Sequence, residues 1–306
     1  MKGSVLVLGG TGFIGSHLIR RCSEIGFKCV SLSLKRNFIK ENLNNVSYLN
    51  IDIRDFSELN KALKDIKFDY VINLSGYINH ASLFHNGIDT YNTHFQGLLN
   101  IISSINLNHV KKFIQIGSSD EYGNTQAPQN ERTREDPITP YSLAKLSCTN
   151  LLKMLHKTEG LPIVVFRLFL VYGEGQKIDR FLPYIIKSCL RKEKFLTSYG
   201  DQIRDFCYVG DIIDGILASF TNQEVNGNII NLASGIPISI RSIIYKVVEN
   251  VGYGEPQFGK IKYRLQENMR LYADIEKAKK LLNWDPKVNL DEGLEKTINY
   301  YKKNLF

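Results

Sequence analysis

The sequence predicts an α/β protein built on a doubly wound parallel sheet, with a smaller lobe towards the C-terminus. Three observations carry this prediction. Apolar runs rich in Val and Ile alternate with helical periods over the first half of the chain. The first run is followed directly by closely spaced glycines and a helical pattern. After residue 172 the alternation loosens, and Gly, Pro and charged residues become frequent.

The expected elements follow one another along the chain. Strands are expected at the runs 4–10, 28–34, 46–52, 70–76, 111–119, 161–169 and 228–234. Helices are expected at 13–26, 56–65, 92–106, 141–160, 236–252 and 274–284. We expect residues 1–172 to form a dinucleotide-binding domain and 173–306 mainly a substrate-binding lobe, with part of 205–240 crossing back.

Composition narrows the class of protein. The 306 residues are 43% hydrophobic, which is enough for a real core. The apolar run in the opening "MKGSVLVLGG" is too short for a signal peptide or a membrane span. The five cysteines form no C-x-x-C pair. We therefore expect a cytoplasmic protein with no disulfide framework and no metal site. The net charge of +8 could indicate nucleic-acid binding, but no nucleic-acid motif accompanies it, and a surface that favours anionic ligands is the simpler interpretation.

The segment "GGTGFIG" predicts a dinucleotide site of the Rossmann type. Glycines between a strand and a helix let a pyrophosphate approach the backbone and the first amide groups of the helix. The alternative is a glycine-rich turn with no ligand, which the position between strand and helix disfavours. We expect the cofactor to contact Gly9, Gly12, Phe13, Ile14 and Gly15.

The end of the second expected strand predicts a preference for NADP(H), with NAD(H) as the other candidate. An acidic residue usually stands there and binds the adenosine ribose, but here Ser33 takes its place. Lys35 and Arg36 follow and could receive a 2′-phosphate, although they could also be ordinary surface charges. Further cofactor contacts are expected from Asp52 and Ile53 after the third strand and from Leu74 and Ser75 after the fourth.

The segment "TPYSLAK" carries a candidate acid/base. Tyr141 and Lys145 are four residues apart and so share one helix face. A neighbouring ammonium group favours loss of the tyrosine proton near neutral pH. Such a pair is common by chance on helix surfaces. The glycine motif, and Ser118 at the end of an expected strand, give it weight.

The chain resembles an extended short-chain dehydrogenase/reductase of the nucleotide-sugar epimerase/dehydratase family. The resemblance runs nearly end to end through "GGTGFIGSHL", "NIDIRD", "GSSDEYG", "PYSLAK", "VYGEGQ", "RDFCYV", "NLASG" and "ADIEKAKKLLNWDP". It implies hydride transfer between a nicotinamide and C4 of a nucleotide-linked sugar. It makes Tyr141 the acid/base at the C4 oxygen, Lys145 a ligand of the nicotinamide ribose, and Ser118 a hydrogen-bond donor to the same oxygen.

The stretch "GSSDEYG" departs from the dehydratases of that family. Aligned without a gap on their S-T-D-E-V-Y-G, Ser119 and Asp120 take the places of the acid and the base, and Glu121 takes the place of the Val. Asp120 is one methylene shorter than the usual Glu, which misplaces it for proton abstraction. We interpret Glu121 as structural, Asp120 as a weak acid/base or substrate contact, and Ser119 as a substrate contact.

The resemblance also assigns residues to the substrate. Arg204 of "RDFCYV" and Arg264 are expected at the nucleotide diphosphate, and Glu267 at its ribose; Arg264 could instead be a surface arginine, since the Pro-Gly of the family segment is missing. His94 stands where the family has Asn. It is expected to be a packed core residue, and it could replace the Asn only by bonding a buried carbonyl group.

Four functions follow in order of preference. The first is a 4-keto sugar reductase acting on a GDP- or CDP-linked sugar, since the motifs lie closest to 4-keto-6-deoxy reductases. The second is a 4-dehydrogenase or 4-epimerase for a hexose or heptose, the third a 4,6-dehydratase, and the fourth a non-catalytic dinucleotide sensor. The resemblance also implies a homodimer formed by the helices near 92–106 and 141–158, unless their apolar faces pack only on the chain's own sheet.

Overall fold

The structure is a computed structural model that describes residues 2–34, 43–264 and 267–305. The chain divides into two compact units. Unit 1 contains Met1–Gly123, Arg134–Arg167 and Gly215–Ile230, and unit 2 contains Asn124–Thr133, Leu168–Asp214 and Asn231–Phe306. The domain boundary near residue 172 stays a prediction.

The larger sheet has seven strands in the order β10-β6-β5-β4-β1-β2-β3. Its strands are β1 (Ser4–Leu8), β2 (Lys28–Ser33), β3 (Val46–Asn50), β4 (Tyr70–Asn73), β5 (Lys112–Ser118), β6 (Ile163–Leu168) and β10 (Asn228–Leu232). The pairs β1–β2, β1–β4, β2–β3 and β4–β5 are parallel. The chain leaves β1 in one direction for β2 and β3 and returns to its other side at β4. This reversal creates the crevice at the carboxyl ends of the strands where such sheets bind ligands.

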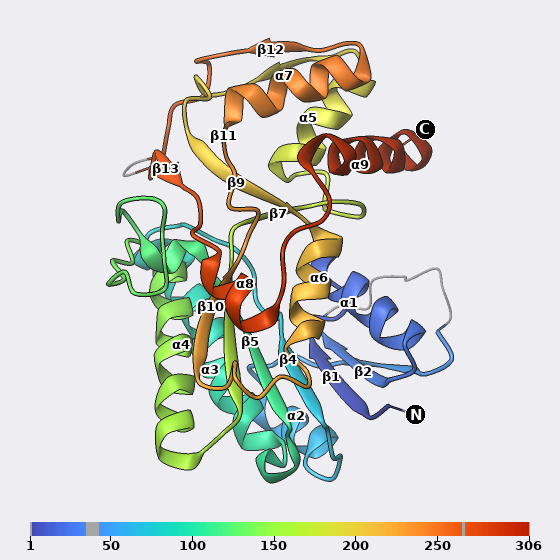
Figure 1. Ribbon diagram of the computed structural model, residues 1–306, viewed down its shortest axis with the longest axis vertical. Helices are drawn as coiled ribbons and strands as arrows, with labels where there is room; N and C mark the ends of the chain where they lie inside the picture. Colours follow the sequence, from blue (N-terminus) through green and yellow to red (C-terminus); the bar gives the residue numbers. More distant parts are fainter. Residues whose placement is uncertain (1, 35–42, 265–266, 306) are drawn as a thin grey trace. The chain divides into compact units, whose positions relative to one another are not determined.

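Among the described residues, four helices belong wholly to unit 1: α1 (Phe13–Glu24), α2 (Phe56–Leu63), α3 (Ile88–Ser104) and α4 (Pro140–Glu159). Helices α2, α3 and α4 pack in succession, and Figure 1 shows α3 and α4 side by side in teal and green. Their apolar faces meet alternate strand residues such as Leu6, Leu8 and Val71, all with no exposed surface. Short helical turns lie at η1 (Leu83–Gly87), η2 (Leu107–His109) and η3 (Ser119–Tyr122).

The described part of unit 2 consists of short strands and helices. The strands are β7 (Leu170–Tyr172), β8 (Lys194–Leu196), β9 (Ile203–Tyr208), β11 (Pro237–Ser239), β12 (Glu255–Gln257) and β13 (Arg270–Leu271). Strand β9 lies between β11 and β13 and also pairs with β7, while β8 pairs with β12. The helices are α5 (Phe181–Leu190), α7 (Ile240–Val251), α8 (Glu276–Leu282) and α9 (Leu290–Asn304), and α6 (Val209–Ala218) begins in unit 2 and ends in unit 1. The side chains between α5, α7 and α9 form the core of this unit.

The predicted fold class is therefore confirmed, with a mixed sheet as the smaller part. The expected helix 236–252 is wrong at its start, where three residues form β11. Strand β11 pairs antiparallel with β9, and Ser239 then caps α7 by accepting a hydrogen bond from the Ser242 N–H at 3.0 Å. Pairing with a strand more than thirty residues away overrides the helical propensity of these three residues.

Candidate active site

The turn between β1 and α1 has the geometry that a pyrophosphate site requires. Gly9 has φ +79°, and a Cβ there would lie 2.8 Å from a carbonyl oxygen at the end of β4. A Cβ at Gly15 would lie 2.3 Å from the Gly9 carbonyl oxygen. Gly12 caps α1 without a side-chain hydrogen bond, and the first turn holds no acidic residue. The first amide groups of α1, at Phe13 and Ile14, therefore suit the pyrophosphate of a dinucleotide.

Ser33 lies beside this turn. It ends β2, is 9% exposed, and its Oγ accepts a hydrogen bond from the Thr11 N–H at 3.2 Å. The place where a ribose-binding carboxylate is usual therefore holds a hydroxyl group that is bonded to the glycine turn. Lys35 and Arg36, the two cations expected at a 2′-phosphate, lie outside the described residues.

Leu74 and Ser75 also lie next to the turn. Leu8 of β1 is the parallel partner of Asn73 of β4, so Gly9 and Leu74 leave the sheet as neighbours. The Ser75 N–H donates to the Asn73 Oδ1 at 3.1 Å, which fixes the start of the segment after β4. The structure thus brings these two residues to the predicted cofactor site.

The segment after β3 is fixed by an arginine and by helix α3. Arg54 donates to the Asp52 carboxylate through Nε and Nη2, at 3.0 and 2.7 Å, and its Nη1 lies 2.8 Å from Asp89. The hydrogen bonds from Arg54 lower the pKa of Asp52. Ile53 is 7% exposed and meets α3 at Gly97, where a Cβ would lie 2.5 Å from its Cδ1. Contacts of Asp52 and Ile53 with the adenine stay predictions.

Three residues of the predicted catalytic set gather at the end of β5. Helix α4 starts with a capping box at Thr139, which places Tyr141 and Lys145 in its first turns. The Lys145 Nζ donates to the Ile116 carbonyl oxygen at 2.9 Å and lies 5.9 Å from the centre of the Tyr141 ring. Ser118 ends the same strand two residues later. Burial lowers the pKa of Lys145, so its ammonium group gives up a proton more readily than that of an exposed lysine.

The two adjacent acids after β5 have opposite surroundings. Glu121 has no exposed surface: its Oε1 accepts from the Ser118 N–H at 2.9 Å, and its Oε2 accepts from Thr149 Oγ1 at 2.9 Å and from Arg167 Nε at 3.0 Å. This carboxylate links β5, α4 and β6, which agrees with a structural role. The Asp120 side chain is 29% exposed and points elsewhere.

Asp120 faces a histidine from the segment after β4. The Asp120 Oδ2 lies 3.7 Å from His80 Nε2, and the His80 ring meets the Tyr141 ring edge-on with centroids 5.6 Å apart. Ser119, the other residue aligned with the dehydratase pair, is 5% exposed. Sequence reasoning missed His80, because nothing in "SGYINHAS" marks it as a neighbour of residues 40 and 61 positions later.

His94 also packs against the Tyr141 ring. It is 5% exposed, its Nε2 lies 3.0 Å from the Tyr77 carbonyl oxygen, and its ring meets Tyr141 edge-on at 5.3 Å. Burial lowers the pKa of His94 to about 3, with a smaller contribution from the Lys145 charge. The neutral ring therefore donates through Nε2 to the carbonyl group of Tyr77, and a role for His94 in place of Asn stays a prediction.

Two of the predicted substrate residues meet within unit 2. Arg204 on β9 is 9% exposed, forms an ion pair with Glu267 through Nη2, and donates through Nη1 to the Ile203 carbonyl oxygen at 2.9 Å. The side chain of Arg264 is exposed, and its carbonyl oxygen accepts from the Glu267 N–H at 3.2 Å. Binding of a diphosphate or ribose by these residues stays a prediction.

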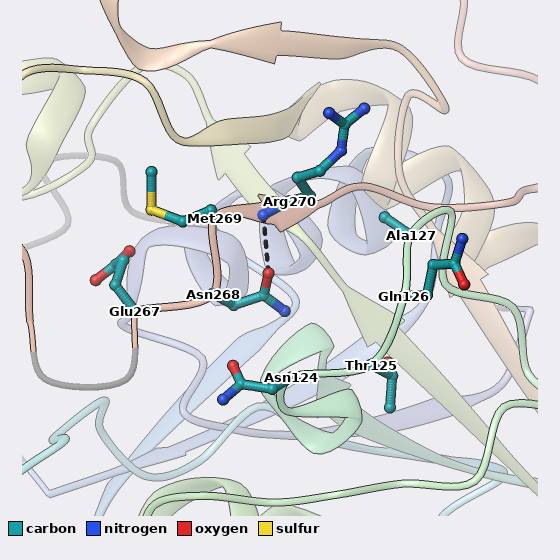
Figure 2. Close-up of a pocket in the computed structure, with 8 residues that line it drawn as sticks. All are labelled: Asn124, Thr125, Gln126, Ala127, Glu267, Asn268, Met269 and Arg270. Atoms are coloured by element: carbon teal, nitrogen blue, oxygen red, sulfur yellow. Dashed lines mark hydrogen bonds between the residues drawn. The ribbon is translucent and has the colours of Figure 1, made fainter.

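A polar cavity of about 490 Å³ adjoins Glu267. Figure 2 shows the residues that line it: Asn124, Thr125, Gln126 and Ala127 from one segment, and Glu267, Asn268, Met269 and Arg270 from the other. The Asn268 Oδ1 accepts a hydrogen bond from the Arg270 N–H at 2.8 Å, which links two of the residues that line the cavity. Sequence reasoning did not bring the first segment to this place, since no motif marks it.

Comparison with known proteins gives the family. A family model described as "NAD dependent epimerase/dehydratase family" matches residues 5–233. The chain belongs to this family of extended short-chain dehydrogenases/reductases. The expectation of an NAD(P)-dependent nucleotide-sugar enzyme of this type is confirmed.

Similar proteins cover the chain nearly end to end. The UDP-glucuronate 4-epimerase of Thermodesulfobacterium geofontis is 32% identical over 265 residues, which cover 85% of this chain and 81% of that protein. The structure of the UDP-glucose 4-epimerase of Thermotoga maritima with UDP-glucose has a TM-score of 0.92 at 26% identity and covers 99% of this chain and 100% of its own. The UDP-glucuronic acid 4-epimerase of Bacillus cereus, in complex with UDP-glucuronic acid and NAD, has a TM-score of 0.88 at 29% identity, with coverage of 99% and 100%.

The described residues contain neither a helix suited to span a membrane nor a cluster suited to hold a metal ion. None of the helices in residues 2–34, 43–264 and 267–305 is long and apolar enough to cross a membrane. The same residues hold no group of three or more His, Cys, Asp or Glu side chains arranged for a metal ion. All five cysteines lie in this part of the chain, and each is a buried free thiol.

Proposed function

We propose that this protein is a nucleotide-sugar 4-epimerase that acts on a UDP-linked sugar with NAD as its cofactor. The observation that carries the proposal is the convergence of Ser118, Tyr141 and Lys145 at the end of β5, on the same edge of the sheet as the glycine turn. The names of similar proteins favour this function, which the sequence left as an alternative, over the GDP- or CDP-linked 4-ketoreductase.

The residues at this edge suit the proton transfers of such a reaction. The Ser118 Oγ accepts from the Asp120 N–H at 3.1 Å, so its own hydrogen can be donated to the C4 oxygen of a sugar. Tyr141 takes the proton of that oxygen and later gives it back. The buried ammonium group of Lys145 stabilises the phenolate that the transfer needs. A nicotinamide held at this site would supply the acceptor and the donor of the C4 hydride.

The glycine turn fits this cofactor, because side chains at Gly9 or Gly15 would collide with backbone atoms that must lie close to the phosphates. The sequence proposal of an NADP(H) preference rests on Ser33, Lys35 and Arg36. Replacement of Ser33 by Asp tests it: if the hydroxyl admits a 2′-phosphate, the ratio of Kd for NAD to Kd for NADP falls by about tenfold or more. An unchanged ratio would show that this position does not select the cofactor.

In unit 2, we propose that Arg204 and Arg264 contact the diphosphate and that Glu267 contacts the ribose. The ion pair between Arg204 and Glu267 supports this assignment only by keeping the two groups together and oriented. Replacement of Arg204 by Gln should raise the Kd for UDP by about tenfold or more, and a matched change at the exposed Arg191 should not. Equal affinities for both variants would contradict the assignment.

We also propose a homodimer formed through α3 and α4. Leu143 and Met154 on α4 are 47% and 45% exposed, beside helix α3. Two apolar side chains at this exposure would be buried by a symmetric copy. Light scattering of the protein and of a Met154→Glu variant tests the dimer: a monomeric parent protein would contradict it.

The proposed activity is tested with purified protein, NAD and, in turn, UDP-glucose, UDP-glucuronate and UDP-N-acetylglucosamine. NMR of the recovered sugar nucleotide should show the C4 epimer of one of them. Consumption of NADPH with a 4-keto-6-deoxy sugar nucleotide, and no epimer from any of the three, would favour the reductase instead. Tyr141→Phe should lower turnover by about a hundredfold or more while UDP binding is retained.

A further inference from the structure

The ring of Tyr141 has an imidazole neighbour that 4-epimerisation does not require. His80 meets the Tyr141 ring edge-on, with ring centroids 5.6 Å apart and an interplanar angle of 78°. C4 oxidation and reduction need only one acid/base, which Tyr141 supplies in the proposed mechanism. A second titratable ring at the same place therefore points to a second proton transfer.

His80 stands beside a carboxylate. Its Nε2 lies 3.7 Å from Asp120 Oδ2, and the two side chains are 27% and 29% exposed. The two residues come from the segments that follow β4 and β5, which are parallel neighbours in the sheet, so the fold brings them together. A carboxylate orients an imidazole and stabilises its protonated form, as in other base–carboxylate pairs. Partial exposure also lets the ring exchange its proton with water.

The other groups around Tyr141 are poorly suited to act as this base. His94 is 5% exposed, donates through Nε2 to the Tyr77 carbonyl oxygen, and packs so closely on Gly76 that a Cβ there would lie 2.2 Å from its Cε1. Glu121 has no exposed surface and accepts from Ser118, Thr149 and Arg167 at once. Asp120 alone is shorter than the dehydratase Glu, whereas the imidazole extends its reach.

We propose that His80, oriented by Asp120, removes and returns the proton on a carbon next to C4, so that the protein also epimerises C3 or C5 of its sugar. This inference rests on the proposed function, because the hydrogens on C3 and C5 become acidic only when C4 is a ketone.

The step balances without a further reactant. While C4 is a ketone, the His80 imidazole takes a proton from C3 or C5. The electron pair of that C–H bond forms a C=C bond, and the carbonyl π pair moves onto the C4 oxygen. Ser118 and the protonated Tyr141 donate hydrogen bonds to this enolate oxygen, and Asp120 compensates the charge of the imidazolium. His80 then returns the proton. On the original face this restores the starting ketone, whereas return after the enolate has turned its other face towards His80 inverts the carbon with no net oxidation.

Deuterium uptake tests the proposal on the unaltered protein. The protein and NAD are incubated in D2O with UDP-glucose, UDP-glucuronate or UDP-N-acetylglucosamine, and the recovered sugar is examined by NMR and mass spectrometry. We expect deuterium at C3 or C5 of the sugar that is converted. A C4 epimer that carries no deuterium overturns the inference alone, while the absence of any C4 epimer overturns the proposed function.

A preformed ketone separates the two outcomes further. UDP-4-keto-6-deoxyglucose in D2O needs no C4 oxidation, so the protein should catalyse its exchange at C3 or C5 above the protein-free rate. His80→Asn should lower the ratio of this exchange to C4 turnover by about tenfold or more, and Asp120→Asn should lower it less. His85→Asn, in the same segment and exposed, is the matched control and should leave the ratio unchanged. Exchange that persists in His80→Asn, or that does not exceed the protein-free rate, overturns the inference.

Discussion

Replacement of Glu121 by Gln should destabilise the protein strongly, although the two side chains have nearly the same size and shape. The Glu121 Oε2 accepts from Thr149 Oγ1 and from Arg167 Nε at 2.9 and 3.0 Å, and it forms an ion pair with Arg167 Nη2 at 2.9 Å. A Gln amide can keep the bond from the Ser118 N–H through its oxygen, but its NH2 group would face the guanidinium of Arg167. The variant thus loses a buried ion pair and places donors against donors.

The structure sets the expected size of this effect. Breaking a buried ion pair from one side costs about 3–5 kcal/mol. Glu135 remains at 2.6 Å from Arg167 Nη2 and continues to compensate its charge, so we expect about 3 kcal/mol. Glu135→Gln is the matched control on the same arginine. Its side chain is 23% exposed, so water can replace it and the loss should be about 1 kcal/mol.

Urea unfolding followed by far-UV circular dichroism measures both variants. Fluorescence is less suitable, because the single tryptophan, Trp284, lies in unit 2 and Glu121 lies in unit 1. The transition of Glu121→Gln should move to lower urea at an unchanged slope. A loss below about 1 kcal/mol, or a loss equal to that of Glu135→Gln, would refute the view that Glu121 is a structural anchor.

Three further predictions follow from the site. His94 has its pKa lowered to about 3 in the folded protein, against about 6.5 unfolded, so its contribution to stability is present above pH 6.5 and is lost as the pH falls towards 3. From pH 7 to 5 this should cost about 2 kcal/mol, measured by urea unfolding, and His94→Asn should remove that share; an unchanged pH dependence would contradict it. Gly15→Ala places a Cβ 2.3 Å from the Gly9 carbonyl oxygen and should raise the Kd for NAD by about tenfold or more in calorimetry, whereas an unchanged Kd would exclude the turn as the pyrophosphate site. Lys145→Met loses the ammonium group beside Tyr141 and should lower kcat by about a hundredfold or more. A kcat within about threefold of the parent's, which is about 0.7 kcal/mol in activation free energy, would contradict the role of Lys145.

Local patterns in the sequence predicted the parts of the site that depend on local geometry. The glycine turn, the neighbouring Ser33 and the α4 pair of Tyr141 and Lys145 each follow from residues a few positions apart, and the structure places them at one edge of the sheet. The structural role of Glu121 was also anticipated. That prediction depends only on the register of the motif, which does not identify the residues that Glu121 contacts.

Contacts between residues far apart in the chain could not be predicted from the sequence. Arg167 meets Glu121 from 46 positions away, and the contact between His80 and Tyr141 joins a loop to a helix. Nothing in the spacing of these residues marks them as neighbours, because the sheet brings their segments together only after folding. The bond between Arg54 and Asp52 is local and could have been found, since a cation two residues after a carboxylate can turn back onto it.

The return of the same hydride to the same carbon tests the proposed 4-epimerase most directly. UDP-glucose labelled with deuterium at C4, or the labelled form of whichever UDP-sugar is converted, is incubated with the protein and a catalytic amount of NAD. We expect a C4 epimer that keeps its deuterium at C4, with no net change in nicotinamide absorbance. Loss of the label to free cofactor, or turnover only when NADPH is consumed, would contradict it and identify a dehydrogenase or reductase instead.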